Sequence, residues 1–213
     1  MRDAVEVSPM IEWAVAAAPL AGESESGDLH LVKPVGRGML VAAVDGLGHG
    51  AEAAAAARAA VAALDRHAEE FVLPLVRRCH AALQGKRGVV LGVAYLDGVK
   101  QSMTWLSVGN VEGVLLYTDQ TARPARPARA SLLTRGGIVG SELPQLRAEV
   151  VPIAAGDILI FATDGIRGGF AEGLPADAGA QQLADQILAH YSKGTDDALV
   201  LVARYLGGGR KRP

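Results

Sequence analysis

The order of its expected strands and helices restricts what this sequence can fold into. It has many apolar runs of strand length and only three helical segments, which are unevenly placed along the chain. The expected helices come as a pair after the third strand, at 51–64 and about 69–83, and once more at 176–191. Eight alanines among residues 51–60 give the first of these a strong helix propensity. Because strands and helices do not alternate as in parallel βαβ units, we expect an α+β fold of antiparallel sheets with helices packed outside.

Strand-like runs occupy most of the remaining chain, between polar or glycine-rich turns. Asp97-Gly98 separates two of these runs and predicts a two-residue hairpin link. No internal repeat or long linker divides the sequence, so we expect one domain over residues 1–206 and a flexible basic tail at 207–213. The expected strands are 11–18, 28–34, 39–44, 88–96, 99–108, 111–117, 131–134, 146–153, 157–163 and 198–205.

The charge and hydrophobicity of the chain exclude several classes of protein. Its 213 residues carry a formal net charge of −2, which gives no basis for nucleic-acid binding, and are 50% hydrophobic, which allows a core without disulfides. No apolar run is long enough to cross a bilayer, and the N-terminus does not resemble a signal peptide. Cys79 is the single cysteine. We therefore expect a cytoplasmic protein with neither a membrane nor a nucleic-acid partner.

Acidic residues stand at the ends of several apolar runs. Asp45 and Asp164 each follow such a run and precede a glycine, Asp196-Asp197 comes just before the last run, and Asp28 opens another. Mg²⁺ and Mn²⁺ prefer carboxylate oxygens as ligands, and strands hold such ligands rigidly. Each Asp-Gly pair on its own is also a common turn. The combination of acids at several strand ends favours a site for a hard divalent cation.

A second interpretation applies to the glycine-rich segment 46–51. It follows a strand, opens a helix and matches the G-x-G-x-x-G/A fingerprint of dinucleotide-binding oxidoreductases, with Asp65 about twenty residues further on. Asp45 would, however, place a negative charge beside the pyrophosphate. Asp65 also lies between two expected helices and not after a second strand. These observations disfavour a dinucleotide site.

Six motifs, in order, resemble those of the bacterial metal-dependent (type 2C, PPM) serine/threonine protein phosphatases. Asp45-Gly46-Leu47-Gly48-His49-Gly50 is similar to the D-G-x-G-H-G signature of that family. Most of the motifs are weak individually, but their joint order over nearly the whole chain is specific. The other five are Ser26-Gly27-Asp28, Val108-Gly109-Asn110 with Leu115-Leu116-Tyr117, Gly137-Ile138-Val139-Gly140, Phe161-Ala162-Thr163-Asp164-Gly165 and Asp196-Asp197-Ala198-Leu199-Val200-Leu201-Val202.

The resemblance implies a four-layer αββα arrangement, in which two antiparallel β-sheets pack as a sandwich with helices on the outer faces. It also implies a centre of two Mn²⁺ or Mg²⁺ ions. Asp45 would bridge both ions, and the carbonyl oxygen of Gly46 would bind one of them. Asp164 and Asp196 would complete the other site.

Three more residues receive roles from the same motifs. Asp28 and Asp197 would either lie around the metal ligands without touching the two ions, or hold an additional ion. His49 would be catalytic, either as a general acid or by orienting a water on the metal. Packing of the His49 side chain at the start of the following helix is an equal alternative.

The RsbX group of stressosome phosphatases is the part of the family that this chain resembles most, because those members are short and carry no sensory module. That resemblance implies phosphorylated STAS-domain proteins of the stressosome scaffold as partners, modified by a switch kinase. The implied reaction is attack of a metal-bridged hydroxide on the phosphorus of a phosphoserine or phosphothreonine. A catalytically weak phosphatase-fold module that only binds phosphoproteins is the alternative.

Three positions depart from the family pattern. Leu199 stands where the family usually has Thr or Ser, Asn110 stands where relatives often have His, and the region of Gly137 lacks the usual proline. None of these is an expected metal ligand, so the departures bear on substrate preference and turnover.

The proline-rich stretch 121–129 contains Arg123, Arg126 and Arg129. It is either a docking element for an acidic partner surface or an exposed, proline-stiffened loop. The sequence favours the loop.

Overall fold

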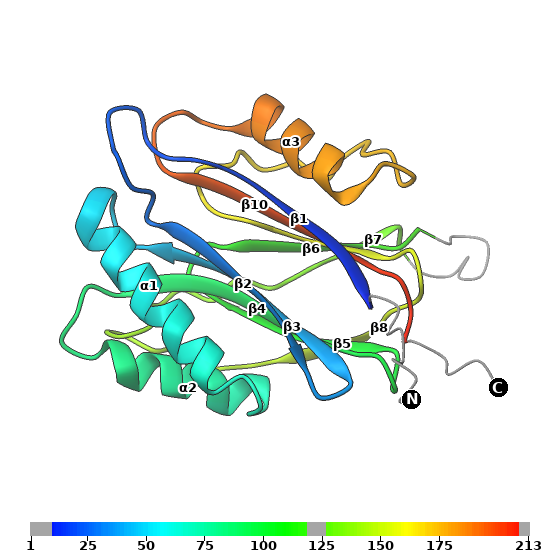
Figure 1. Cartoon of the computed structure of the whole chain (residues 1–213), viewed down its shortest axis with the longest axis horizontal. Helices are drawn as coiled ribbons and strands as arrows, with labels where there is room; N and C mark the ends of the chain where they lie inside the picture. Colours follow the sequence, from blue (N-terminus) through cyan, green and yellow to red (C-terminus); the bar gives the residue numbers. More distant parts are fainter. Residues whose placement is uncertain (1–9, 119–126, 209–213) are drawn as a thin grey trace, which may run out of the picture.

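Two five-stranded antiparallel β-sheets form the body of the molecule, which the computed structural model describes for residues 10–118 and 127–208 (Figure 1). They pack as a sandwich between outer helices, so the expected α+β, αββα arrangement is confirmed. The first sheet, called the β10 sheet, has the order β1 (Ile11–Ala18), β10 (Ala198–Tyr205), β9 (Ile158–Ala162), β6 (Glu112–Leu116) and β7 (Arg129–Ser131). The second, called the β3 sheet, has the order β2 (Asp28–Val35), β3 (Gly38–Gly46), β4 (Val89–Asp97), β5 (Ser102–Val108) and β8 (Glu149–Pro152).

Helices cover the outer face of each sheet (Figure 1). α1 (Gly50–Arg66) and α2 (Val72–Leu83) pack on the β3 sheet, and α3 (Ala180–Tyr191) packs on the β10 sheet. The chain leaves β3 through both helices and returns in β4, which runs antiparallel to β3. A dinucleotide-binding unit requires a parallel return, so the dinucleotide interpretation of segment 46–51 is wrong.

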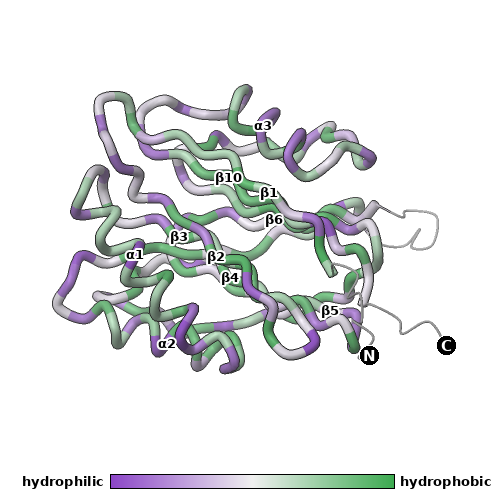
Figure 2. Tube along the Cα trace, in the orientation of Figure 1, coloured by the Kyte–Doolittle hydropathy of each residue, from purple (hydrophilic) through white to green (hydrophobic). Residues whose placement is uncertain are grey.

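Apolar side chains fill the space between the sheets and the space under the helices. Trp105 and Phe161 are fully buried between the sheets. Figure 2 shows apolar residues running along the central strands, including β10. On the inner side of α1, small alanines such as Ala53, Ala57 and Ala60 are fully buried. Their size lets the helix axis approach the β3 sheet closely.

The hairpin between β4 and β5 differs from the prediction. Asp97 pairs with Ser102, so the loop contains the four residues 98–101 and not two. Oδ1 of Asp97 accepts hydrogen bonds from the backbone amides of Val99 at 2.9 Å and Lys100 at 3.0 Å. This side-chain turn satisfies the amides inside the loop, which widens the connection beyond a two-residue turn.

The third helix begins later than predicted, at Ala180 and not at 176. Oε1 of Glu12, on the neighbouring β1, accepts a hydrogen bond from the amide of Ala180 at 2.9 Å. A side chain from another strand therefore satisfies a free amide at the helix start, and sequence propensity carries no sign of such a distant partner. The strands expected at 131–134 and 146–153 are also displaced or shortened, to β7 and β8.

The end of the described chain lies beside the β4–β5 loop. A Cβ added to Gly208 would lie 2.1 Å from the carbonyl oxygen of Gly98, so the two backbones are in close contact. The rest of the expected basic tail, residues 209–213, lies outside the described residues. Within the described ranges, no helix is long and apolar enough to cross a membrane.

Gly92 of β4 provides a test of the packing between the sheets. A Cβ at this position would lie 2.7 Å from Cε1 of Phe161 and 3.1 Å from Cγ1 of Val111. Because the buried Phe161 ring has little room to move, we expect Gly92→Ala to lower the free energy of unfolding by about 1–3 kcal/mol. Chemical denaturation measures the change. Gly136→Ala, where a Cβ meets nothing within 4 Å, is the control and stays within about 0.5 kcal/mol of the wild type.

The burial of Cys79 predicts an unreactive thiol. The residue is fully buried in α2, and burial raises the pKa of its thiol to about 12. Because the thiolate is the reactive form, we expect no reaction with Ellman's reagent at pH 8 in native protein and complete reaction of one thiol in guanidinium chloride. Rapid labelling of the folded protein would contradict the packing of α1 against α2.

Candidate active site

Acidic residues from both sheets come together at one end of the sandwich. Asp28 opens β2 and Asp45 lies near the end of β3, and the register places the two residues directly opposite each other. In the β10 sheet, Asp164 follows β9 and Asp196 precedes β10, which is the strand paired with β9. The charges of Asp28, Asp164 and Asp196 all act on the Asp45 carboxyl. The structure thus brings four sequence-predicted residues to one place.

Burial and the charges of neighbouring aspartates oppose ionisation of two members of this acidic cluster, Asp45 and Asp28. Burial raises the pKa of Asp45 to about 9, and the charges of the surrounding aspartates add to the effect. Burial also raises the pKa of Asp28 to about 7, against a hydrogen bond from Thr163 that lowers it. Among the described residues, no basic side chain forms an ion pair with any aspartate of the cluster. A cation is the group that would relieve this repulsion.

The glycines that follow Asp45 and Asp164 are required by close packing. A Cβ on Gly46 would lie 2.2 Å from the carbonyl oxygen of Ala53 in α1. A Cβ on Gly165 would lie 2.0 Å from the carbonyl oxygen of Asp197. Each Asp-Gly pair therefore lets its turn sit directly against a neighbouring backbone, which fixes where the preceding carboxylate emerges.

Asp197 is buried and uses both of its oxygens on backbone amides. Oδ1 accepts a hydrogen bond from Leu20 at 2.7 Å, and Oδ2 accepts one from Gly27 at 2.7 Å. Both donors lie in the loop between β1 and β2, which leads into Asp28. Asp197 thus holds this loop in place beneath the cluster, while Asp196 beside it is only partly buried.

The hydroxyl of Thr163 connects the two sheets at the cluster. It donates to Oδ2 of Asp28 at 2.7 Å and accepts from the amide of Leu199 at 2.8 Å. The motif comparison included Thr163 but gave it no role. The sequence signal that could have indicated a role for Thr163 is its position as a polar residue directly between a fully apolar strand and an aspartate.

Asp164 has two partners that the sequence analysis did not pair with it. Asn110, in the turn between β5 and β6, donates from Nδ2 to Oδ2 of Asp164 at 2.8 Å. The ammonium group of Lys193 donates to the carbonyl oxygen of Asp164 at 2.5 Å. The amide of Lys193 also donates to the carbonyl oxygen of Gly165 at 2.8 Å. The segment before β10 therefore packs on the turn that carries Asp164.

His49 lies exposed at the start of α1 and pairs across the loop with Glu23. Its Nδ1 is 2.6 Å from Oε1 of Glu23, and the side chain makes no capping bond to the helix. Arg87 supports the same loop, because it donates to the carbonyl oxygen of Leu47 at 3.1 Å and pairs with Glu52 at 2.8 Å. His49 is thus held by a carboxylate from the β1–β2 loop.

The residues of the cluster fit a hard divalent cation by their chemistry. Within the described ranges, no three His, Cys, Asp or Glu side chains are already arranged to hold an ion. The cluster nevertheless supplies only oxygen donors, from Asp45, Asp164 and Asp196, with the carbonyl of Gly46 close by in sequence. Without a cation these carboxylates repel one another, and coordination would draw them together.

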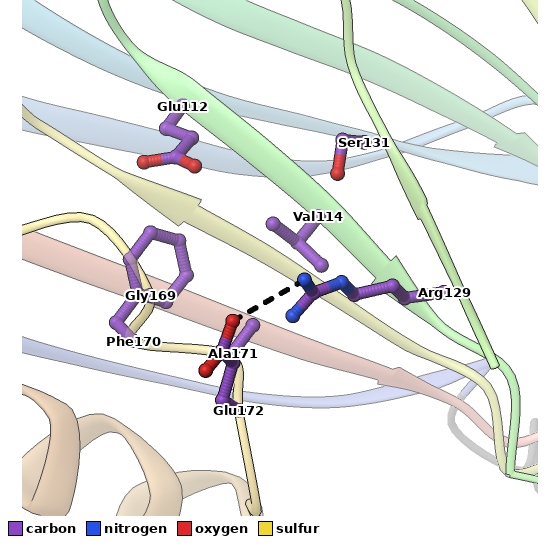
Figure 3. A pocket seen from close by; sticks show the side chains of 8 residues that line it. All are labelled: Glu112, Val114, Arg129, Ser131, Gly169, Phe170, Ala171 and Glu172. Atoms are coloured by element: carbon purple, nitrogen blue, oxygen red, sulfur yellow. Dashed lines mark hydrogen bonds and ion pairs between the residues drawn. The ribbon is translucent and has the colours of Figure 1, made fainter.

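A separate shallow pocket lies over β6 and β7 on the β10 sheet (Figure 3). Arg129 crosses it toward Glu172, with Nη2 3.4 Å from Oε1. None of the clustered aspartates lines this pocket. Arg123 and Arg126, the other arginines of the proline-rich stretch, lie outside the described residues. The role of the stretch therefore stays a prediction.

Comparisons of sequence and structure relate this chain to phosphatases. The family model described as stage II sporulation protein E (SpoIIE) matches residues 36–206. A phosphoserine phosphatase, RsbX of Bacillus subtilis (strain 168), is 30% identical over 111 residues, which are 52% of this chain and 56% of that protein. The match thus spans little more than half of the length of this curated relative.

Solved structures agree with the family match. A chain from a study of the bacterial stressosome, described as a modular system adapted to control secondary messenger signalling, is 28% identical, with a TM-score of 0.81 over 91% of this chain and 99% of that one. A crystal structure of RsbX with magnesium has a TM-score of 0.79 at 22% identity, over 92% of this chain and 95% of that one.

The PP2C phosphatase domain of SpoIIE from Bacillus subtilis has a TM-score of 0.73 at 22% identity, over 93% of this chain and 64% of that one. At such identities, the likeness to RsbX and to this domain shows the fold. The family match covers most of the chain, and the predicted resemblance to type 2C phosphatases is confirmed. The chain belongs to the stage II sporulation protein E (SpoIIE) family and has the fold of the PP2C-type phosphatases.

Proposed function

We propose that this protein hydrolyses phosphoserine or phosphothreonine esters on a partner protein. The observation that carries the proposal is the meeting of Asp28, Asp45, Asp164 and Asp196 at one end of the sandwich, with no basic side chain of the described chain paired to them. A phosphate ester carries a charge of about −1.5 to −2 at neutral pH. An acidic cluster can bind such a group only through cations.

In the proposed site, Asp45 and the carbonyl of Gly46 hold two Mn²⁺ or Mg²⁺ ions together with Asp164 and Asp196. When bound, the ions supply charge neutralisation at the phosphate and activation of water. Strand ends and tightly packed turns fix the backbone at these ligands, so coordination would draw their side chains together around the ions while the backbone stays in place.

The residues around these ligands set their positions. In the proposal, Asp197 supports the site by holding the loop that leads into Asp28. His49, held by Glu23, acts either as the general acid at the leaving serine or threonine oxygen or by orienting a water on the metal. This assignment gives His49 the catalytic role expected from its motif, with Glu23 fixing the orientation of the ring.

Phosphorylated STAS-domain proteins of a stressosome scaffold are the proposed partners. Support comes from the relative named phosphoserine phosphatase RsbX and from the similar chain of the stressosome study. In this role the protein opposes a switch kinase in the cytoplasm. The alternative, a module that binds phosphoproteins without turnover, shares the same fold and differs in releasing no phosphate.

Phosphate release from a phosphorylated STAS-domain protein tests the proposed reaction. We expect release that requires Mn²⁺ or Mg²⁺ and stops with chelator. We also expect Asp45→Asn and Asp164→Asn to lower kcat/KM by about 100-fold or more, because each removes a charged ligand. Asp65→Asn is the control, since exposed Asp65 pairs with Lys33 near the C-terminal end of α1 and should keep full activity.

Two results would count against this proposal. Full turnover after exhaustive chelation would exclude the proposed metal chemistry. Tight binding of the phosphoprotein with no phosphate release in the presence of Mn²⁺ would favour the binding module.

Metal binding should also appear in stability, independently of turnover. Ions that bind only the folded state stabilise it by about 2.7 kcal/mol at about 100 times Kd. We therefore expect Mn²⁺ to raise the melting temperature of the wild type and of Asp65→Asn. Asp45→Asn should lose this rise, yet without metal at neutral pH it should melt higher than the wild type, because the raised pKa of the Asp45 carboxyl, about 9, destabilises the folded state above the carboxyl's ordinary pKa. A Mn²⁺ response of Asp45→Asn equal to that of the wild type would contradict the assignment.

A further inference from the structure

Thr163 is the polar residue that joins the two sheets at the acidic cluster. It directly follows β9 of the β10 sheet, whereas its partner Asp28 opens β2 of the β3 sheet. Thr163 is 1% exposed and Asp28 is 4% exposed, so water competes little for this contact. A hydrogen bond to a buried carboxylate is among the stronger interactions that a hydroxyl makes.

The direction of the Thr163 hydrogen bonds follows from its surroundings. The amide of Leu199 donates to Oγ1 at 2.8 Å, which occupies a lone pair of the hydroxyl. Oγ1 lies 2.7 Å from Oδ2 of Asp28 and 3.4 Å from the carbonyl oxygen of Leu199, so its single hydrogen goes to the nearer acceptor, Oδ2. Because Leu199 belongs to the regular ladder of β10, the backbone fixes where Oγ1 lies and hence where it holds the carboxylate.

Asp28 has one oxygen held and one oxygen available. Oδ2 is engaged by Thr163, while no donor among the described residues reaches Oδ1. Directly opposite in the ladder lies Asp45, whose carboxyl repels that of Asp28. Without the hydroxyl, no other donor among the described residues would hold the orientation of the Asp28 carboxyl.

We propose that Thr163 is a positioning residue that orients Asp28 toward the divalent-cation centre, and so makes the site depend on correct docking of the two sheets. The inference rests on the proposed function, because it assumes that the cluster binds a cation. Thr163 contacts neither substrate nor ion in this role and acts only through Asp28. The burial that raises the pKa of Asp28 is opposed mainly by this hydrogen bond, which agrees with a hydroxyl that favours the charged carboxylate.

Calorimetric titration of Mn²⁺ into ion-free protein tests this role without an activity assay. Thr163→Val keeps the shape of the side chain and removes the hydroxyl. We expect it to weaken Mn²⁺ binding by about 10–100-fold, as loss of a group that orients a ligand does. Thr163→Ser keeps the hydroxyl, and we expect it to bind Mn²⁺ within about threefold of the wild type.

Tyr95→Phe is the matched control for loss of a hydroxyl. Its hydroxyl donates to the carbonyl oxygen of Val35 at 3.3 Å, at the end of the β3 sheet away from Asp28. We expect this variant to lose some stability and to keep the Mn²⁺ affinity of the wild type. The comparison separates a general loss of stability from a specific loss of affinity.

Several outcomes would overturn the proposal. Unchanged Mn²⁺ affinity in a destabilised Thr163→Val would mean that the hydroxyl serves packing alone. If Thr163→Val does not fold by circular dichroism, Asp28→Asn tests the same link, and unchanged affinity in that variant would reject it. Absence of Mn²⁺ binding by the wild type would instead refute the proposed centre itself, so the two failures are distinguishable.

Discussion

Repulsion among aspartates at one end of the sandwich is the constraint to which the surrounding structure responds. Asp28 and Asp45 face each other across a strand ladder, and Asp164 and Asp196 approach from the other sheet. A group of neighbouring carboxylates is unfavourable in a folded protein unless the surrounding structure holds the side chains apart and a positive charge neutralises them. The buried layers of the sandwich supply the first requirement, and the proposed cations supply the second.

Several carboxylate oxygens of the cluster accept hydrogen bonds from neighbouring side chains and backbone amides. Thr163 holds Asp28, Asn110 holds Asp164, and both oxygens of Asp197 accept backbone amides. Each such bond limits the rotation of its carboxylate, and the bond from Thr163 also favours the charged form of Asp28. Limited rotation reduces the side-chain entropy that binding of a ligand would otherwise cost.

The sequence predicted the fold class and the location of the cluster because both depend on local patterns. Apolar runs mark buried strands, and Asp45 and Asp164 are visible as acids directly after such runs. Partners distant in sequence left no comparable signal. The bonds from Thr163 to Asp28 and from Leu20 to Asp197 join residues more than 130 positions apart. The four-residue β4–β5 loop was missed because a single side chain, that of Asp97, decides its length.

The pairing of β1 with β10 has a consequence for how the protein is made on the ribosome. β1 lies at the edge of its sheet and pairs there with β10, and the loop after β1 is held by Asp197, which precedes β10. A nascent chain can fold the β2–β3–β4–β5 meander early, because these neighbours are close in sequence. Strand β1, however, has no partner in its sheet until the ribosome has released β10. The acidic cluster is therefore completed only after β10 has been made and has paired with β1.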